Sequence, residues 1–362
     1  MKRVLYIVQH RMGRSPGQRF RCEQYLEYLE QNGYEITYSN LINEREDAVF
    51  YSKGNYLKKL QFFIKSFRRR LQDVKRAGDF DIIFIYREAF MIGTTYFEKK
   101  IARKCKNIIL DFDDSIWLND VSLGNSNLKW LKNPLKTDKI ISLSKCIFAG
   151  NSYLATYALK FNYNIKIIPT TIDTDYHTSK IWEKEKKGVC IGWTGTATTL
   201  KHLETAIPVL NRIKQKFKES VYFKVIVNFE YQNELLEISS TPWKKETEIQ
   251  DLCEIDIGIM PLPDDEWSKG KCGFKGLQYM ALEIPTIMSP VGVNSEIISD
   301  GVNGFLAATE EEWVEKISAL IESRELREKL GKAGRQTVVE KYSVEAWKER
   351  YLSYFNEIVI LD

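Results

Sequence analysis

Short apolar runs rich in β-branched and aromatic residues alternate along the chain with longer stretches of helical periodicity. The alternation starts at once, with a predicted strand at 3–8 and a predicted helix at 18–31. Parallel strands need crossover connections of about this length, and helices usually supply them. The rhythm therefore predicts α/β domains in which helices cover both faces of a parallel sheet.

The pattern divides the chain into two doubly wound units. At 362 residues the chain is longer than one hydrophobic core usually supports, so two domains are expected. The first unit spans 1–170, with further predicted strands at 34–38, 81–86, 107–112, 146–149 and 165–168. The second spans 188–342, with predicted strands at 188–193, 221–227, 255–260, 285–288 and 300–307 and helices near 199–216 and 272–283.

The polar stretch 171–187 lies between the units and is predicted to be a linker. Ligands of open α/β sheets bind beyond the carboxyl ends of the strands, so two Rossmann-like units in tandem are expected to face a central cleft. The fold alone does not name the ligand.

Composition argues against several functional classes. The six cysteines are scattered singly and there are only three histidines, so no metal site or dithiol is predicted. No apolar run approaches the roughly 18 to 20 residues that cross a bilayer, and the first residues lack a secretory signal, so a cytoplasmic protein is expected. A net charge of +4 does not by itself indicate nucleic acid, and no nucleic-acid partner is predicted.

The most informative stretch is 256–307, DIGIMPLPDDEWSKGKCGFKGLQYMALEIPTIMSPVGVNSEIISDGVNGFLA. It resembles the donor-binding half of family-4-like GT-B glycosyltransferases, in which a Pro-containing strand end, a Gly-Phe loop, a helix and later glycine motifs follow in this order. The matching elements are Met260-Pro261, Gly273-Phe274, Leu277 to Ala281, Ile284-Pro285, Gly292 to Glu296, and Asp300-Gly301 with Gly304.

The resemblance implies a nucleoside-diphosphate sugar bound at the start of the predicted helix. A helix N-terminus presents unpaired N–H groups and a positive partial charge, which suit a diphosphate. Lys271 and Lys275 would add full charges there, and Lys275 is assigned a catalytic role on the leaving group. The alternative is that these lysines only solvate an exposed loop. Gly292 is predicted to contact the same donor.

The chain departs from the family at two positions. The family commonly has two glutamates separated by seven residues, the second of which is assigned to the donor ribose. Here these positions hold Gly270 and Gln278. Gln278 can hydrogen-bond a ribose hydroxyl but carries no charge, so donor binding is either weakened or retuned.

Upstream, the strand at 188–193 runs into a glycine turn that resembles the opening of the family's donor domain. Thr194, Gly195 and Thr196 are predicted to line the phosphates with backbone N–H groups.

The first unit is expected to supply the acceptor side. Asp113 and Asp114 follow a predicted strand, where the family often has a His-Asp pair facing the donor sugar, so the resemblance implies catalytic positions. Carboxylates there could bind sugar hydroxyls or deprotonate an acceptor hydroxyl. They could equally cap the following segment in solvent.

Two other strand ends contribute acceptor-side candidates. The first strand leads to Gly13, Arg14 and Arg19, and another ends at Arg87 and Glu88. Guanidinium groups recognise phosphate or carboxylate with two hydrogen bonds, which suits an acceptor that carries either group. Surface arginines on the first helix are an equal alternative.

Residues 55–76 form a predicted amphipathic basic helix with eight Lys or Arg and one acid, Asp73. Such a helix can lie on an anionic membrane, where a lipid-linked acceptor would supply the reason. It can also pack on the sheet as an ordinary helix, and the two roles can coexist. The apolar positions at helical spacing are Leu57, Leu60, Ile64, Phe67, Leu71 and Val74.

From 310 onward the chain has helical periodicity and resembles the family's closing segment, in which the last helix, here 343–362, crosses back to the N-terminal domain. The whole pattern predicts transfer of a sugar from a nucleoside-diphosphate sugar to a saccharide or lipid-linked saccharide in surface polysaccharide or glycoconjugate synthesis. The family implies retention of configuration, no cofactor beyond this co-substrate and no metal. The basic helix is compatible with a protein that binds the inner face of the membrane.

Two other functions fit the sequence less closely. A sugar-nucleotide epimerase shares the architecture but converts the donor without an acceptor. A non-catalytic partner that binds sugar nucleotide or glycolipid would explain the two missing glutamates.

Overall fold

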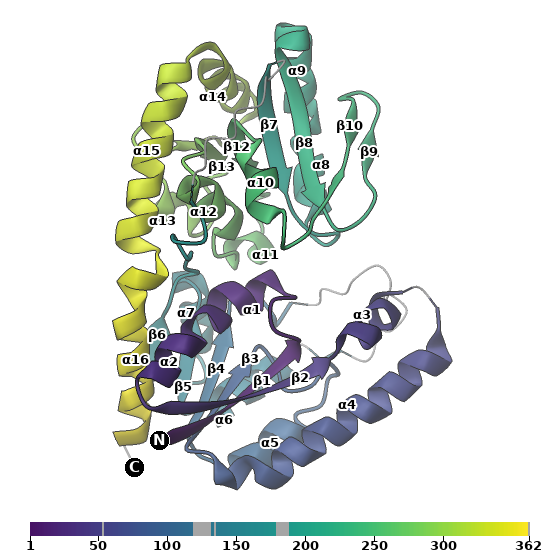
Figure 1. Ribbon diagram of the computed structural model, residues 1–362, viewed down its shortest axis with the longest axis vertical. Helices are drawn as coiled ribbons and strands as arrows, with labels where there is room; N and C mark the ends of the chain where they lie inside the picture. The colour runs from purple at the N-terminus through teal and green to yellow at the C-terminus, as the bar shows by residue number, and fades with distance from the viewer. Residues whose placement is uncertain (53, 119–131, 134, 179–187, 361–362) are drawn as a thin grey trace. The chain divides into compact units, whose positions relative to one another are not determined.

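The computed structural model describes residues 1–52, 54–118, 132–133, 135–178 and 188–360. The chain divides into two compact units, unit 1 with Met1–Thr170 and Lys348–Asp362, and unit 2 with Thr171–Trp347. Each unit contains a six-stranded sheet whose strands are all parallel (Figure 1). The prediction of two α/β domains with parallel sheets is confirmed. Part of the predicted linker, 179–187, lies outside the described residues.

The sheet of unit 1 has the strand order β2-β1-β3-β4-β5-β6. Strands β1, β3 and β4 are neighbours, so their carboxyl ends share one stretch of the sheet edge. The five residues of β3 and of β4 are all buried, as expected for strands covered on both faces. The strands are β1 (Lys2–His10), β2 (Tyr34–Ile42), β3 (Ile82–Tyr86), β4 (Ile108–Phe112), β5 (Cys146–Ala149) and β6 (Ile165–Ile167).

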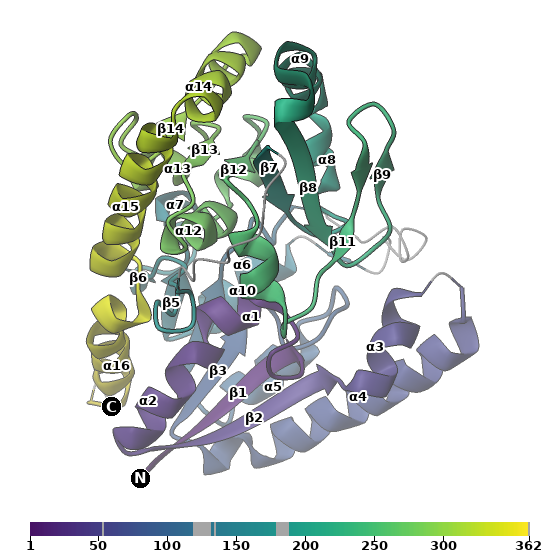
Figure 2. The same ribbon diagram turned by 45° about the horizontal axis from the view of Figure 1, so that its top comes forward.

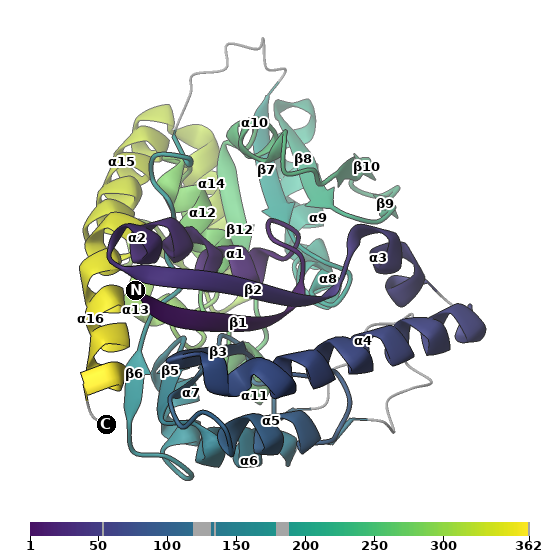
Figure 3. The same ribbon diagram turned by 60° about the horizontal axis from the view of Figure 1, so that its bottom comes forward.

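Helices flank both faces of this sheet, with α4 and α5 on one side of β1 and β2 and α1 and α2 on the other (Figure 3). The predicted helix at 18–31 is interrupted, because Cys22 leaves helical geometry at φ −135°. The helices are α1 (Pro16–Arg21), α2 (Leu26–Gln31), α3 (Glu44–Tyr51), α4 (Tyr56–Arg76), α5 (Tyr96–Ala102), α6 (Lys136–Leu143), α7 (Ser152–Ala158) and α16 (Val344–Ile360).

The last helix, α16, contributes to the core of unit 1 through its aromatic side chains. Tyr351 stacks on Tyr25 with ring centroids 4.1 Å apart. Phe355 stacks on Phe84 of β3 at 6.2 Å. Both α16 side chains are fully buried, so this end of the chain is held by hydrophobic packing.

The sheet of unit 2 has the order β11-β8-β7-β12-β13-β14, and a short antiparallel pair, β9 with β10, stands apart from it. Strands β7 and β12 are adjacent, and both end at the edge where the predicted donor motifs lie. The strands are β7 (Val189–Thr194), β8 (Val221–Val227), β9 (Gln232–Asn233), β10 (Ile238–Ser239), β11 (Thr241–Pro242), β12 (Ile257–Met260), β13 (Thr286–Met288) and β14 (Phe305–Leu306).

Two apolar clusters hold the layers of unit 2 together. Figure 2 shows helices of this unit packed around its sheet. Ile213 of α9 and Ile317 of α14 pack in one cluster, and Tyr279 of α12 packs in the other. The predicted helix at 199–216 is broken before Pro208, which cannot donate a backbone hydrogen bond and stands in the first turn of α9. The helices are α8 (Leu200–Glu204), α9 (Ile207–Phe217), α10 (Glu248–Cys253), α11 (Glu266–Lys269), α12 (Phe274–Ala281), α13 (Asn294–Ile297), α14 (Glu310–Glu322) and α15 (Arg324–Lys341).

The predicted basic helix at 55–76 is present as α4, but its apolar side chains are not all in the core. Phe62 and Val74 are buried, whereas Leu57, Leu60 and Ile64 are 80%, 56% and 44% exposed. The first half of α4 therefore carries an apolar strip that the described part of the chain does not cover. No helix among the described residues is both long and apolar enough to cross a bilayer.

Candidate functional site

In unit 1 the carboxyl ends of β3 and β4 are joined by an arginine–carboxylate network. Arg87 follows β3 with a left-handed backbone (φ +62°), and its N–H donates to the carbonyl of Asp111 at 2.7 Å. Its guanidinium donates to Asp113 from two nitrogens at 2.8 and 2.6 Å, and to Asp114 at 2.8 Å. Three residues predicted for this unit, Arg87, Asp113 and Asp114, therefore lie in direct contact.

The start of α1 packs against the same network. The Tyr86 hydroxyl donates to Asp113 at 2.9 Å. A Cβ placed on Gly17 would lie 2.2 Å from that hydroxyl and 3.2 Å from an oxygen of Asp113. Only glycine allows this approach, and sequence reasoning did not single out Gly17.

The carboxylate of Asp113 is held in its ionised form. Burial opposes ionisation, but the charges of Arg87 and Arg21 and the hydrogen bonds from Arg87 and Tyr86 lower the pKa of Asp113 below its usual value. A carboxylate with a low pKa is a weak proton acceptor and a strong hydrogen-bond acceptor. Asp113 is therefore suited to holding a hydroxyl group rather than to deprotonating it.

Asp111 of β4, two residues before Asp113, forms a completely buried ion pair with Arg21. The guanidinium donates to both carboxylate oxygens at 3.1 and 2.6 Å, and neither side chain is exposed. Burial raises the pKa of Asp111 to about 6 even though Arg21 acts in the opposite direction. A third nitrogen–oxygen contact of Arg21, to the carbonyl of Ile168, connects α1 to the chain beyond β6.

The other acceptor-side candidates are engaged within unit 1. Arg14 forms an ion pair with Asp47 of α3, a helix that the sequence rhythm did not predict. The N–H of Gly13 donates to Glu23 at 2.7 Å, and the Arg19 guanidinium lies 4.9 Å from the Phe20 ring centroid.

Glu88 is likewise paired. It accepts from Gln9 at 3.1 Å and binds Lys136 at 3.1 Å. Neither Gln9 nor Lys136 was a candidate from the sequence, because an ion pair between distant segments leaves no local pattern.

In unit 2 the segments around the start of α12 pack backbone against backbone. Gly273 caps α12 with φ +68°, and a Cβ there would lie 2.2 Å from the Ile297 side chain. Gly292, predicted for the donor site, has φ +55°, and a Cβ there would lie 2.7 Å from the carbonyl of Lys269. Both positions require glycine, so the loops before and after α12 and β13 are held closely together.

The two predicted lysines lie over tryptophan rings. The Lys275 ammonium is 5.6 Å from the ring centroid of Trp193, the buried last-but-one residue of β7. The Lys271 ammonium is 4.8 Å from the ring centroid of Trp267 in α11. Cation–π contacts are attractive and help to hold each charge in place.

The backbone N–H groups of Thr194, Gly195 and Thr196, predicted to bind the phosphates, all donate hydrogen bonds within unit 2. The N–H of Thr194 donates to the Tyr279 hydroxyl at 2.8 Å, that of Gly195 to the carbonyl of Ile226 at 3.1 Å. The N–H of Thr196 donates to the hydroxyl of Thr199 at 2.9 Å. The exposed hydroxyl of Thr196 is what this turn presents to solvent.

Gln278 is 2% exposed and belongs to a buried polar cluster. Its amide nitrogen lies 3.4 Å from His177 Nε2 and 3.4 Å from a carboxylate oxygen of Glu248. That oxygen also accepts from Trp243 at 3.2 Å. Glu248, on the unpredicted helix α10, thus places a carboxylate beside the position where the resemblance expected one.

His202 on α8 was also missed from the sequence. Its side chain is buried at 1% exposure, and neither ring nitrogen has a hydrogen-bond partner among the described residues. Burial, followed by the charges of Lys275, Lys271 and Lys201, lowers the pKa of His202 to about 3, with Asp265 acting in the opposite direction. The ring is therefore neutral at physiological pH.

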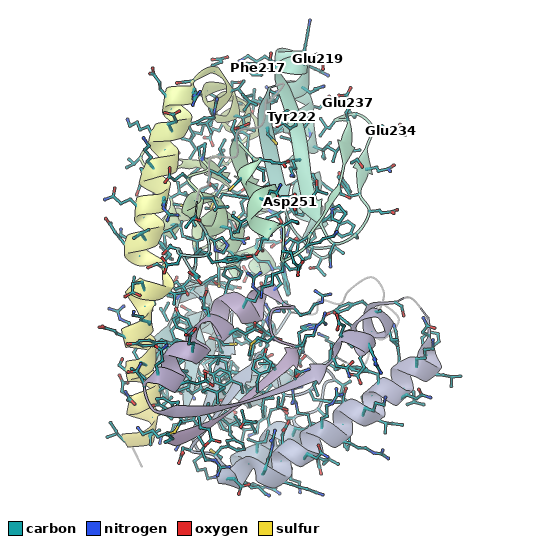
Figure 4. The ribbon with its side chains drawn as sticks, in the orientation of Figure 1. Phe217, Glu219, Tyr222, Glu234, Glu237 and Asp251 are labelled. Atoms are coloured by element: carbon teal, nitrogen blue, oxygen red, sulfur yellow. The ribbon has the colours of Figure 1, made fainter. Side chains whose placement is uncertain are left out.

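Exposed acidic side chains gather at the opposite, amino-terminal end of the unit 2 strands. Figure 4 shows Glu219 just before β8 and Glu237 just before β10. Lys214 lies 3.9 Å from the Glu219 carboxylate and 2.9 Å from that of Glu237.

Comparison with known proteins agrees with this arrangement. Residues 178–337 match the family model of glycosyl transferases group 1. The chain has the fold of GT-B glycosyltransferases. No curated protein sequence is significantly similar to it.

Solved glycosyltransferases share the fold of this chain over nearly its whole length. A glycosyltransferase from Rickettsia africae has a TM-score of 0.69 at 14% identity, covering 99% of this chain and 98% of that one. A sucrose-phosphate synthase from Thermosynechococcus elongatus has 0.69 at 10% identity with both chains fully covered. Anabaena HepE in complex with UDP and glucose has 0.65 at 11% identity, covering 98% of this chain and 100% of that one.

Proposed function

We propose that unit 2 binds a nucleoside-diphosphate sugar and that the enzyme transfers its sugar, with retention of configuration and without a metal, to a hydroxyl of a saccharide or lipid-linked saccharide. The observation that carries the donor assignment is the pair Lys271 and Lys275, fixed over two tryptophan rings at the start of α12 in the domain that matches glycosyl transferases group 1. Complexes of Anabaena HepE with UDP and with UDP-glucose support a nucleotide-sugar donor.

In this proposal the lysines neutralise the charge that grows on the departing diphosphate. The bond from the acceptor oxygen to the anomeric carbon forms as the bond from that carbon to the phosphate oxygen breaks. The acceptor's proton goes to the departing phosphate oxygen, so no enzyme base is required. This fits Asp113, whose low pKa suits it to hydrogen-bond a hydroxyl group and not to take its proton.

The donor is tested by thermal shift with UDP-, GDP-, ADP- and dTDP-sugars, since a ligand that binds the native state raises the melting temperature. A selective shift is expected, and it should shrink in Lys271→Ala and Lys275→Ala. Lys329→Ala, at an exposed lysine on α15, is the matched control and should keep the full shift. If no nucleotide sugar shifts the protein, the donor assignment is wrong. Transfer that stops in EDTA would refute the metal-free mechanism.

We further propose that the first half of α4 rests on an anionic membrane at the cytoplasmic face, where a lipid-linked acceptor in polysaccharide or glycoconjugate synthesis would be found. Leu57, Leu60 and Ile64 recur at i, i+3 and i+7 and share one exposed face. Lys58 and Lys65 are exposed beside them. An apolar strip bordered by cations suits an interfacial helix, with each cation contributing about 1 kcal/mol on anionic lipid.

Vesicle sedimentation tests this surface. The protein should bind vesicles of mixed phosphatidylcholine and phosphatidylglycerol and not phosphatidylcholine alone. The triple variant Leu57→Ser, Leu60→Ser, Ile64→Ser should lose binding. The double variant Leu235→Ser, Val302→Ser removes two equally exposed apolar side chains elsewhere and should bind normally. Equal binding by the two variants would exclude α4 as the membrane surface.

A further inference from the structure

His202 stands out among the buried polar side chains of unit 2. A neutral imidazole has one N–H donor and one acceptor nitrogen, and burying both without partners costs free energy. Neither ring nitrogen of His202 has a hydrogen-bond partner among the described residues, and His202 is only 1% exposed. An unsatisfied buried pair of this kind requires an explanation, such as a ligand that completes it.

Two further unsatisfied polar atoms lie on the segments that meet at the start of α12. The hydroxyl of Ser268, three residues before Lys271, is buried with no hydrogen-bond partner among the described residues. The side-chain oxygen of Asn294 is in the same state, 3.6 Å from where a Cβ on Gly273 would sit. Unsatisfied groups therefore accumulate where the proposed donor diphosphate would bind.

The charges around His202 are strongly unbalanced. Lys275 and Lys271 come from α12 and the loop before it, and Lys201 comes from α8 itself. The largest opposing influence is the acid Asp265, which caps α11 and accepts from the N–H of Ser268 at 2.7 Å. Burial keeps the ring neutral first, and the three cations add to this effect. An anionic ligand would neutralise the cations and favour the protonated ring.

We infer that His202 is a proton-coupled ligand of the donor diphosphate. This inference rests on the proposed function. A nucleotide sugar bound beside Lys271 and Lys275 makes the neutral ring of His202 take up one proton from solvent. The resulting imidazolium then donates an N–H to a phosphate oxygen. No bond to carbon or phosphorus changes in this step, and the added positive charge stays beside the leaving group during transfer.

The inference predicts how donor affinity depends on pH. Because binding takes up a proton, the dissociation constant should fall as pH is lowered from about 7.5 to about 5.5. The diphosphate of a nucleotide sugar is a diester that stays ionised where histidine titrates, so the effect cannot come from the ligand. In His202→Gln, which keeps an amide donor but cannot ionise, the dissociation constant should be independent of pH in this range.

The deciding experiment is an NMR titration of 15N-histidine-labelled full-length protein with UDP-glucose, GDP-mannose, ADP-glucose and dTDP-glucose. The chain has only three histidines, so the ring signals can be assigned from His10→Gln, His177→Gln and His202→Gln. Without ligand, His202 should stay neutral to about pH 4, given a pKa of about 3. With the nucleotide sugar that binds, its pKa should rise by about 4 units, to about 7, and His10 in unit 1 serves as the internal reference.

The possible outcomes separate this inference from the proposed function. If a nucleotide sugar binds and the His202 signals do not change with pH, the inference is wrong and the donor assignment stands. If none of the four binds, the donor assignment fails and the inference fails with it. The wild-type titration decides the question even if His202→Gln does not fold.

Discussion

The two units satisfy the charges of their candidate sites in different ways. In unit 1 the carboxylates Asp113 and Asp114 are paired with Arg87, and Asp111 with Arg21. In unit 2 the cations Lys271 and Lys275 lie over aromatic rings, and neutral His202 lacks hydrogen-bond partners among the described residues. A network whose charged side chains pair with one another can orient an uncharged hydroxyl group. An excess of positive charge beside a buried histidine ring that lacks hydrogen-bond partners suits an anion.

The largest effect is expected from breaking the buried pair of unit 1. Arg21→Met leaves the Asp111 carboxylate buried without its cation, so the free energy of unfolding should fall by about 3–5 kcal/mol in urea titrations. Arg76→Met removes a partly exposed partner of Asp73, which keeps Arg70, and should cost at most about 1 kcal/mol. Equal losses in the two variants would contradict the view that unit 1 depends on buried pairing.

The next effect concerns the lysine charges of unit 2. Lys275→Ala removes a cation that acts on the leaving group, so kcat should fall by about 100-fold or more, as for loss of other transition-state donors. The melting temperature without ligand should change little, because the contact of this lysine with Trp193 is a cation–π contact, worth about 0.5–2 kcal/mol. Lys329→Ala should retain full turnover in the same assay. Unchanged turnover in Lys275→Ala would remove its catalytic role.

A smaller effect is expected in the pH dependence of stability. The folded protein keeps His202 and His10 neutral, since burial, followed by nearby cations, lowers their pKa values to about 3 and about 4. The unfolded chain binds these protons near pH 6.5, so the free energy of unfolding should decrease as pH falls from about 6.5 toward 4. His202→Gln should reduce this slope by up to one proton. An identical slope in wild type and variant would show that His202 is protonated in the folded state.

The smallest effect tests the exposed face of α4 in unit 1. Leu60→Ala should change the free energy of unfolding by less than about 0.5 kcal/mol, as expected for an exposed side chain. Phe62→Ala, two residues away on the buried face, should cost about 3–5 kcal/mol. Chemical denaturation of the two variants measures both values. A large cost for Leu60→Ala would mean that its apolar strip is part of the fold.

Much of the fold could be predicted from periodicity, and the site only in part. Burial on both faces gives β3 a continuous apolar run and β4 an apolar run interrupted by Asp111, which is why the parallel sheet could be predicted. The helices α3 and α10 were missed, and with them Asp47 and Glu248. Their contacts join segments far apart in sequence, so no local pattern marks them.

The same limit applies to the candidate ligands. The order of motifs in 256–307 predicted a helix beginning near Lys271 and Lys275, and α12 begins at Phe274. It could not show that the N–H groups of Thr194 to Thr196 already have partners, or that Gln278 is buried against His177. Hydrogen-bond satisfaction is a property of the packed chain, because each donor can choose among partners that only folding brings close.

The sequence by itself determined two parallel α/β domains, the basic helix α4 and the family resemblance, since these depend on residue type and spacing along the chain. Only the tertiary structure decided which face of α4 is covered, that Asp113 is an ionised acceptor, and that His202 is buried among lysines. Burial and charge act through space, so the environment of an ionisable group is set by neighbours that the sequence places far away.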